Sequence, residues 1–509
     1  MQQEDDSSTT HADVDPNYRT RNISRGLGSL AIQNIITSIL AFVFLAVLLR
    51  LTSPTDYTAY SSVLVTIGVA VIVSTFALQV AAARYVSLFL EEDEKKAWAV
   101  ARSILVLSLV FSVVATAVFE SVTPFLSLYF MKSTNWTFLF DLGGIWLLGY
   151  SFSTILQGVI QGMKKYALLA KMLVISRVAM VVFAIATLEL YHNPDFAIVA
   201  WIIYCIILIA WPVHYIFPHI FQKFDKNYYR QAMKYSTPLA IAAILGIISS
   251  SGDSIVVGGF TNSLGPYNAA IQISSTLGLV IVTPLMTTLL PEASSSSKDD
   301  AKMAYGLRLA IRFLILGLLP VSLLMAGMSI QLLSLFSGGG SYLSAVGALQ
   351  IIAVTYLFFG AQSVAYSLLQ AIGRTIQVLI VGFVAALADI VLAILLVPGS
   401  GMIGGAMSRT FEALAGMIVA VYFARRYFVN LDSRTFYLKG LAASILPFAI
   451  VFGLTTFVSS RTLTLIPYAI IWLGAFLACV KGMKILTDED RTFIAHLLPA
   501  QLQKFLKYF

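Results

Sequence analysis

The sequence predicts an all-α integral membrane protein of about 14 transmembrane helices, and three observations support this fold class. First, the 509 residues are 58% hydrophobic and 11% charged, whereas soluble domains are roughly 45–50% apolar and about 25% charged. Second, apolar stretches as long as a bilayer core requires, roughly 20 residues each, recur from Leu27 to Leu486. Third, basic residues concentrate in alternate predicted loops.

Apolar runs between polar breaks define the individual helices. The predicted spans are 27–49, 58–80, 98–121, 137–161, 166–189, 197–218, 234–259, 267–290, 306–329, 343–370, 375–397, 402–424, 440–458 and 465–486. Residues 1–26 are polar and acidic, lack the pattern of a signal peptide and are expected to form a disordered cytoplasmic tail. Residues 487–509 carry an apolar stripe and are expected to form an amphipathic helix on the cytoplasmic membrane surface.

The distribution of lysine and arginine predicts the orientation in the cell (plasma) membrane. With the N-terminus inside, 24 of the 33 basic residues fall on the inner side and only Arg50, Lys132 and Arg461 fall on the outer side. Cytoplasmic loops carry such an excess, so both termini are expected in the cytoplasm. The net charge of +8 is then explained by contact with the anionic inner leaflet, and no nucleic-acid partner is implied.

Several kinds of chemistry have no support in the sequence. The two cysteines, Cys205 and Cys479, lie inside apolar helices and form neither a disulfide framework nor a metal cluster. No Gly-Lys dipeptide occurs, which excludes a phosphate-binding loop of the usual form. A membrane glycosyltransferase or glycan polymerase would need catalytic acids on substantial external loops. The outer loops here are short and carry few acidic residues, among them Asp56 and Asp195. We therefore expect neither an enzyme nor a cofactor.

An internal repeat divides the chain. Similar turns follow the first and seventh helices and the fourth and tenth helices, and they pair Thr52 with Thr261, Tyr60 with Tyr267 and Gln157 with Gln370 at offsets of 209, 207 and 213 residues. Six helices per repeat give two parallel six-helix bundles around a central cavity. The bundles are expected at 27–233 and 234–427, and helices 13–14 follow at 428–486.

Six motifs resemble those of one transporter family. They are RLTSPTDYTAYS after the first helix, TPLAIAAILGIISSSGDSIVVGGFTNSLGPYNAA in the seventh, LLPEAS at the end of the eighth, LSLFSGGGSYLSAVGALQ before the tenth, GMIGGAMSRTFEALAG in the twelfth and LTDEDRTFIAHLLPAQLQKFL at the C-terminus. In this order they resemble the polysaccharide and lipid-linked oligosaccharide flippases of the multidrug/oligosaccharidyl-lipid/polysaccharide exporter superfamily. One position departs from the family pattern, because Gly252 stands where many relatives have a basic residue before the aspartate.

The resemblance implies that the chain moves a polyprenyl-(pyro)phosphate-linked glycan from the inner to the outer leaflet by alternating access. The implied partners are a lipid-linked glycan and membrane lipid. The alternative is a cation-coupled exporter of drugs or other small amphiphiles with the same fold. Such an exporter would depend mainly on acidic residues inside the membrane.

Five charged residues lie deep within predicted spans: Arg177, Asp253, Asp389, Arg409 and Glu412. Each costs roughly 2.5–3.5 kcal/mol to insert, so each is a functional candidate. Arg177 is expected to bind the substrate phosphate, and Asp253, the aspartate of the seventh-helix motif, is assigned to the same substrate site. Asp389, Arg409 and Glu412 are expected to bind a coupling cation, H⁺ or Na⁺. Arg409 and Glu412 share a helix face and could instead simply pair with each other.

Seven other charges lie near helix ends. Among them Arg102, Lys171, Arg308 and Arg312 begin cytoplasmic turns and are expected to extend along the helix toward the membrane surface.

Overall fold

The computed structural model describes residues 16–90, 92–216, 226–283, 285–286, 300–425, 432–457 and 464–486. Every regular element in these ranges is helical, and 12 of the helices are long and apolar enough to cross a membrane. Two further spans bring the number to the predicted fourteen. The 50-residue α15 (Thr375–Ala424) is two helices joined at Gly401, and α9 (Leu264–Leu277) continues through a π-helical turn, Gly278–Val282.

The reversal within α15 is visible in its backbone. Fifty residues of straight helix would extend far beyond a bilayer core of about 30 Å. At Gly401 the backbone has φ 57° and ψ −134°, a combination that only glycine adopts readily. A Cβ atom on Gly404 would lie 2.5 Å from the carbonyl oxygen of Leu396, so the two halves fold directly back on one another.

The first bundle contains seven helices. They are α1 (Pro16–Leu51), α2 (Pro54–Thr75), α3 (Leu78–Leu90), α4 (Glu94–Met131), α5 (Thr137–Gly162), α6 (Tyr166–Tyr191) and α7 (Asp195–Ile216). The first helix begins at Pro16, inside the segment expected to be a disordered tail, and proline is well suited to that first helical position. Residues 1–15 and the expected amphipathic helix at 487–509 lie outside the described residues.

The second predicted span is broken. Phe76 and Ala77 adopt positive φ angles of 46° and 54°, so α2 ends and α3 begins within the stretch predicted as one helix. Nearby, the backbone of Gln79 lies against α5, where a Cβ atom on Gly158 would be 2.4 Å from the Gln79 carbonyl oxygen. Tertiary packing therefore produces a break that an uninterrupted apolar sequence does not indicate.

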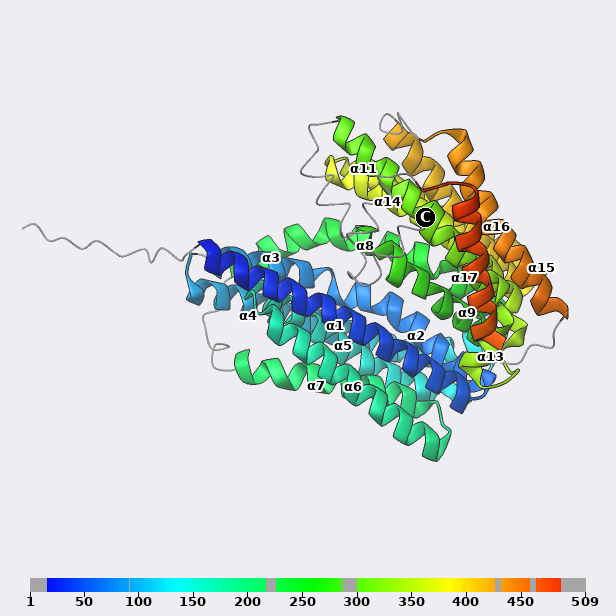
Figure 1. Ribbon diagram of the computed structural model, residues 1–509. Coiled ribbons are helices and arrows are strands. Elements are labelled where there is room, and N and C mark those ends of the chain that lie inside the picture. Colours follow the sequence, from blue (N-terminus) through cyan, green and yellow to red (C-terminus); the bar gives the residue numbers. More distant parts are fainter. Residues whose placement is uncertain are drawn as a thin grey trace, which may run out of the picture.

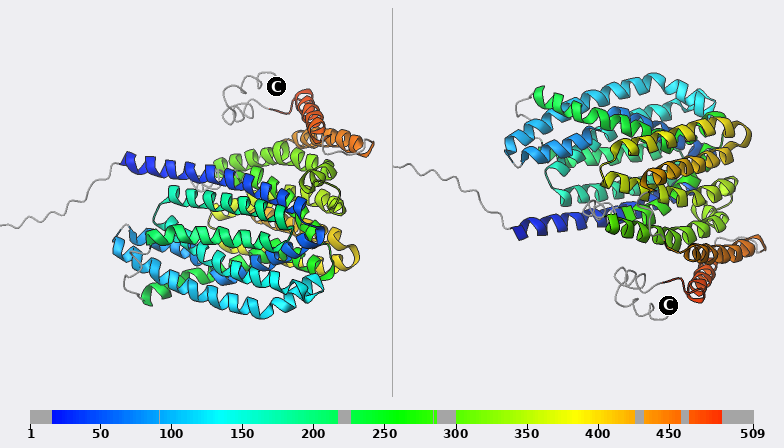
Figure 2. Two further views of the ribbon diagram at one scale, coloured as in Figure 1. Left: turned by 90° about the horizontal axis from the view of Figure 1, so that it is seen from below. Right: turned by 90° about the horizontal axis from the view of Figure 1, so that it is seen from above.

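The second bundle is formed by α8 (Lys226–Phe260), α9, α11 (Asp300–Phe313), α12 (Leu319–Gly327), α13 (Ser329–Ser337), α14 (Val346–Ala371) and α15. A π-helical turn, Leu314–Leu318, joins α11 to α12 just before Pro320. Proline cannot donate its backbone hydrogen bond, and such local widening accommodates the loss. Helices α16 (Arg434–Phe457) and α17 (Leu465–Gly482) pack on each other, and α16 contacts α12; Figure 2 shows this pair to one side of the bundles.

The two bundles repeat the same packing. Helix α1 packs on α6 as α8 packs on α15, and α2 packs on α5 as α9 packs on α14. The repeated turns match in detail, because the hydroxyl of Thr52 donates to the Leu48 carbonyl at 2.6 Å and that of Thr261 donates to the Val257 carbonyl at 2.7 Å. The predicted two-bundle architecture is thus confirmed.

Two of the three expected residue pairings are wrong by one helical turn. The turns after α5 and α14 contain equivalent backbone hydrogen bonds, Lys164 N to Gln161 O and Lys165 N to Ile160 O in one, and Gly373 N to Gln370 O and Arg374 N to Leu369 O in the other. Gln370 therefore corresponds to Gln161, at an offset of 209, and not to Gln157.

The tyrosine pairing shifts for the same reason. The backbone N–H groups of Tyr57 and Tyr267 donate to the carbonyls of Ser53 and Ser263, the residues just before α2 and just before α9. Tyr267 corresponds to Tyr57, at an offset of 210, and not to Tyr60. With the threonine pair at 209, the offsets at all three places now agree to within one residue.

The two bundles meet mainly at one end, which we call the Thr52 end; the opposite end, containing the α5–α6 turn, is the Lys164 end. Figure 1 shows α2, α9 and α13 converging at the Thr52 end. Among the described residues, five hydrogen bonds join the bundles at the Thr52 end: Arg50 Nη2 to Leu335 O (2.7 Å), Gly265 N to Thr58 Oγ1 (3.2 Å), Tyr129 Oη to Ile255 O (3.4 Å), Tyr342 Oη to Ser53 O (3.5 Å) and Lys132 Nζ to Gly259 O. All of the acceptors are uncharged.

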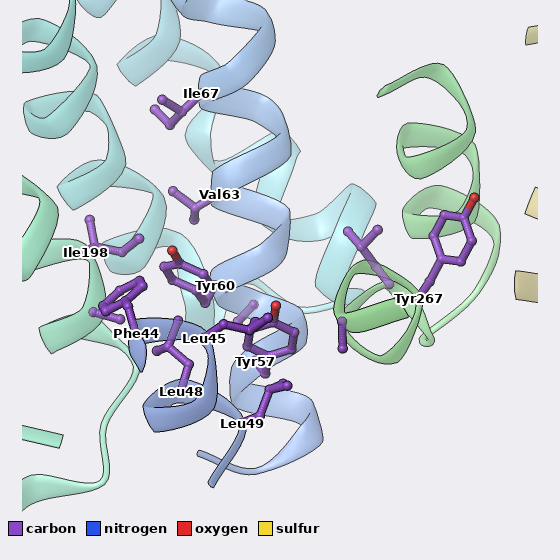
Figure 3. Close-up of a cluster of buried hydrophobic side chains, with 14 of the residues drawn as sticks. Phe44, Leu45, Leu48, Leu49, Tyr57, Tyr60, Val63, Ile67, Ile198 and Tyr267 are labelled. Atoms are coloured by element: carbon purple, nitrogen blue, oxygen red, sulfur yellow. The ribbon is translucent and has the colours of Figure 1, made fainter. Parts of the chain in front are cut away.

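A large apolar core supports the Thr52 end. Figure 3 shows Phe44, Leu45, Leu48 and Leu49 of α1 gathered beside the tyrosines of α2. These side chains are nearly inaccessible to solvent, so their burial stabilises the convergence of the helices.

At the Lys164 end, α8 bridges the bundles. Its first turns contact α3 through the ring pairs Phe89–Tyr228 (5.1 Å between centroids) and Tyr85–Tyr235 (5.8 Å), and the Arg84 guanidinium lies 4.4 Å from the Tyr235 ring. Figure 1 shows α8 running from α3 across the molecule to α9. One helix therefore contacts both halves along its length.

Candidate functional site

A cavity of about 540 Å³ lies within the second bundle. From α14 it is lined by residues at helical spacing that reach its last turns, namely Ile352, Thr355, Tyr356, Phe359, Gln362, Ser363, Tyr366, Ser367 and Gln370. Helix α8 adds Gly246, Ser249 and Ser250, and the second half of α15 adds Arg409 and Glu412. The cavity thus extends toward the Lys164 end and is lined by hydroxyl, amide and charged groups.

An ion pair lies at the cavity wall. Arg409 donates to both carboxylate oxygens of Asp253, from Nε at 2.7 Å and from Nη2 at 2.8 Å. Nη2 also donates to the Ser250 carbonyl at 2.8 Å. The Asp253 side chain is 0% exposed, whereas that of Arg409 is 16% exposed and faces the cavity. This bidentate geometry is the strong form of the interaction.

Asp389 completes a chain of polar groups behind the pair. Its Oδ2 accepts the backbone N–H of Asp253 at 2.9 Å, and its Oδ1 is buried without a hydrogen-bond partner among the residues that the structure describes. The hydroxyl of Tyr267 donates to Asp253 from the other side. A buried carboxylate oxygen without a donor is unusual in a folded protein.

Glu412 lies one turn beyond Arg409 on the cavity wall. It accepts a hydrogen bond from the Ser249 hydroxyl, while Arg409 pairs with Asp253. The alternative that Arg409 and Glu412 simply pair with each other is therefore wrong. The structure brings four of the five candidate residues, Asp253, Asp389, Arg409 and Glu412, into one cluster.

Arg177 lies in the other bundle. Its guanidinium lies 4.8 Å from the Trp201 ring and 5.3 Å from the Tyr204 ring of α7, and Nη1 contacts the Met180 sulfur at 3.5 Å. Trp201 in turn donates to the Tyr60 hydroxyl at 2.9 Å. No carboxylate in the described ranges is within ion-pair distance of Arg177, so the cation is held by two aromatic faces and the Met180 sulfur. Arg177 and Asp253, expected in one substrate site, belong to separate bundles.

One helix-end charge differs from expectation. Arg312 does not extend to the surface but is buried, and it donates from Nε and Nη2 to Asp432, both at 2.7 Å. Its partner lies just before α16, so the pair connects the second bundle to the last two helices. Sequence reasoning missed this because the two residues are 120 positions apart.

The site also contains an uncharged residue, Tyr267, which a search for charged residues within the predicted spans does not find. Tyr267 is completely buried and shares Asp253 with Arg409. In the sequence, Tyr267 stands out only because it lies in the repeated turn after α8. That position indicates the internal repeat and does not indicate a binding site.

Two bundles of this kind, with a polar cavity in one of them and buried charges at mid-helix, define a polytopic membrane protein built from two similar halves. Residues 23–297 match the sequence profile of the family described as polysaccharide biosynthesis protein, and the chain belongs to that family. The family resemblance of the motifs is thereby confirmed. An uncharacterised membrane protein of Methanocaldococcus jannaschii is 21% identical over 348 residues, which cover 66% of this chain and 68% of that protein.

Solved structures share the fold. An inward closed structure of the lipid II flippase MurJ has a TM-score of 0.72 at 14% identity and covers 89% of this chain and 97% of its own. An inward-facing multidrug resistance MATE family transporter has a TM-score of 0.61 at 13% identity, covering 79% and 98%. A Vibrio cholerae MATE transporter scores 0.56 at 14% identity, covering 80% and 99%.

Proposed function

We propose that this chain is a flippase that moves a polyprenyl-(pyro)phosphate-linked oligosaccharide or polysaccharide precursor from the inner to the outer leaflet. The observation that carries the proposal is the cavity of the second bundle, which combines a fixed cation, Arg409, with hydroxyl and amide groups. A phosphate requires a cation inside a low-dielectric cavity, and hydroxyls and amides are suited to hydrogen-bond sugars. The match of the lipid II flippase fold supports the same class of substrate.

Alternating access provides the mechanism. The bundles are closed at the Thr52 end, and the cavity reaches the Lys164 end. By the predicted topology the Lys164 end is cytoplasmic, so the cavity faces the leaflet from which the precursor is taken. Separation of the bundles at the Thr52 end and their approach at the Lys164 end would release the head group outside.

Arg177 supplies the second cation of the proposal. It has no anionic partner within the described residues, and its aromatic contacts hold the guanidinium without neutralising it. We propose that it attracts the substrate phosphate during passage along the first bundle, while Asp389 and Glu412 exchange a coupling cation.

The test is complementation of a strain that lacks its own copy. Arg177→Ala should abolish surface glycan while the protein still reaches the membrane, and Arg177→Lys should retain part of the activity because charge survives without the bidentate fork. Lys171→Ala is the matched control, because this lysine is exposed on the same helix. Normal glycan display by Arg177→Ala would contradict the role of Arg177.

The alternative function is cation-coupled export of small amphiphiles. The observation that favours it is the pair of carboxylates, Asp389 and Glu412, beside the cavity in a fold shared with MATE transporters. Loss of drug resistance in Asp389→Asn, together with intact glycan display in Arg177→Ala, would replace the flippase with the exporter.

A further inference from the structure

Arg409 is held on one side only. Its Nε and Nη2 groups donate to Asp253 and Ser250, whereas Nη1 donates no hydrogen bond to any residue in the described ranges. The side chain is partly exposed and lines the cavity, while Asp253 is fully buried behind it. A guanidinium in this position can bind a second anion from the cavity side without a change in the backbone.

We propose that Asp253 and the phosphate group of the substrate share Arg409 by competing for it, and that phosphate binding is linked to uptake of a proton by the Asp253–Asp389 carboxyl pair. The inference rests on the proposed function and names the part of the substrate that this site recognises. This role of Arg409 differs from simple ion coupling, because the guanidinium that binds the substrate is also the group that neutralises the Asp253 carboxylate.

The count of charges around the site supports the link. The charged groups that face one another are Asp253 from α8 and Asp389, Arg409 and Glu412 from α15, and the titratable hydroxyls are Tyr267 from α9 and Tyr356 from α14. Among the described residues of the site, one cation therefore serves three carboxyl groups. A phosphate that draws Arg409 away leaves Asp253 buried without a cation, which is strongly unfavourable.

A proton restores the balance. Oδ1 of Asp389 is buried and accepts no hydrogen bond from any described residue, and Oδ2 already accepts one from the Asp253 backbone. The pair thus has an acceptor ready for a proton at the moment when the guanidinium leaves. Release of the phosphate on the other side would return Arg409 to Asp253 and expel the proton.

The experiment measures binding of farnesyl pyrophosphate to the full chain in lipid nanodiscs, at two pH values on either side of neutrality, with farnesol as the phosphate-free control. Proton uptake is followed with an indicator dye in weakly buffered solution. The variants are Asp253→Asn, Arg409→Lys and the double variant Asp253→Asn/Arg409→Gln, in which both charges of the ion pair disappear together so that neither member is left without the other. Arg312→Gln/Asp432→Asn is the matched control, because it removes an equally close ion pair outside the cavity.

The wild type should take up protons on binding. Asp253→Asn should bind more tightly at the higher pH, by about tenfold, and take up fewer protons, since Arg409 no longer has a competitor. The double variant should bind about tenfold or more weakly than the wild type, Arg409→Lys should be intermediate, and the control pair should bind normally. The pyrophosphate group of the ligand itself binds and releases protons as the pH changes, and it does so equally with every variant. The test therefore compares the affinity and the proton uptake of each variant with those of the wild type.

Wild-type affinity in the double variant would overturn the inference, as would unchanged affinity and proton uptake in Asp253→Asn. If the wild type bound no farnesyl pyrophosphate yet supported glycan display, the shared-cation inference would fail and the flippase proposal would stand. If glycan display did not require the protein at all, the flippase proposal itself would fail.

Discussion

Gly252 and Asp389 are packed so closely that a Cβ atom at position 252 would lie 2.6 Å from Oδ2 of Asp389. The same oxygen accepts the backbone N–H of Asp253. The glycine that departs from the family pattern therefore leaves room for a carboxylate from α15. The positive charge beside Asp253 comes instead from Arg409, on the far half of that helix.

Gly252→Ala should displace the Asp389 carboxylate and leave the Asp253 N–H unsatisfied. Loss of one buried hydrogen bond to a charged group predicts a destabilisation of about 1–3 kcal/mol, measured as a lower midpoint of thermal unfolding in detergent. Gly246→Ala in the same helix is the control for stability, because its Cβ atom would meet nothing within 4 Å. Equal midpoints for the two variants would contradict the contact.

The closure of the Thr52 end should depend on Gly265. A Cβ atom there would lie 2.5 Å from Thr58 Oγ1 and 2.8 Å from the Thr58 backbone nitrogen, so Gly265→Ala should push α9 away from α2. We expect faster labelling of Asn268→Cys, a buried site one turn further along α9, by a membrane-impermeant maleimide in a background without Cys205 and Cys479.

Gly339→Ala is the control for this gate, since its Cβ atom would meet nothing within 4 Å at the same end of the molecule. If Gly265→Ala did not change the labelling rate, the contact between α2 and α9 would not hold this end closed.

The buried pair of Arg312 and Asp432 should be important for attaching the last two helices. Arg312→Met removes both hydrogen bonds to the buried Asp432 carboxylate and leaves it the longer contact with Arg308 Nε, at 3.8 Å, so it should destabilise the protein by up to about 3–5 kcal/mol. The double variant Arg312→Met/Asp432→Leu should recover much of that loss, as measured by thermal unfolding. A double variant no more stable than the single one would show that the pair does not act as a unit.

The predicted orientation places Lys132 outside and Lys164 inside. Single cysteines at these positions, in a chain lacking the two native cysteines, should react in intact cells only at position 132. Reaction from outside at position 164, or within residues 219–233, would show that the predicted orientation is inverted. The result also decides which leaflet the cavity faces in the state described here.

The sequence by itself determined the class of the fold. The apolar surplus requires lipid to cover the helices, and the repeat of about 210 residues requires two similar bundles, because both properties are sums over many positions and tolerate local error. The family followed from motifs spread along the chain. Two of the three repeat pairings were one turn out, since glutamines and tyrosines one turn apart are equally plausible partners when only their spacing is known.

Only the tertiary structure decided which charges meet. Arg409 pairs with Asp253, 156 positions away, and not with Glu412, which shares its helix face. Arg177 lies in the other bundle, and Arg312 is buried against Asp432. Helical periodicity places a side chain on a face of its own helix, but the partner of that face depends on how bundles pack and where a helix such as α15 reverses. Those contacts join residues far apart in the chain, and a single sequence contains no local signal for them.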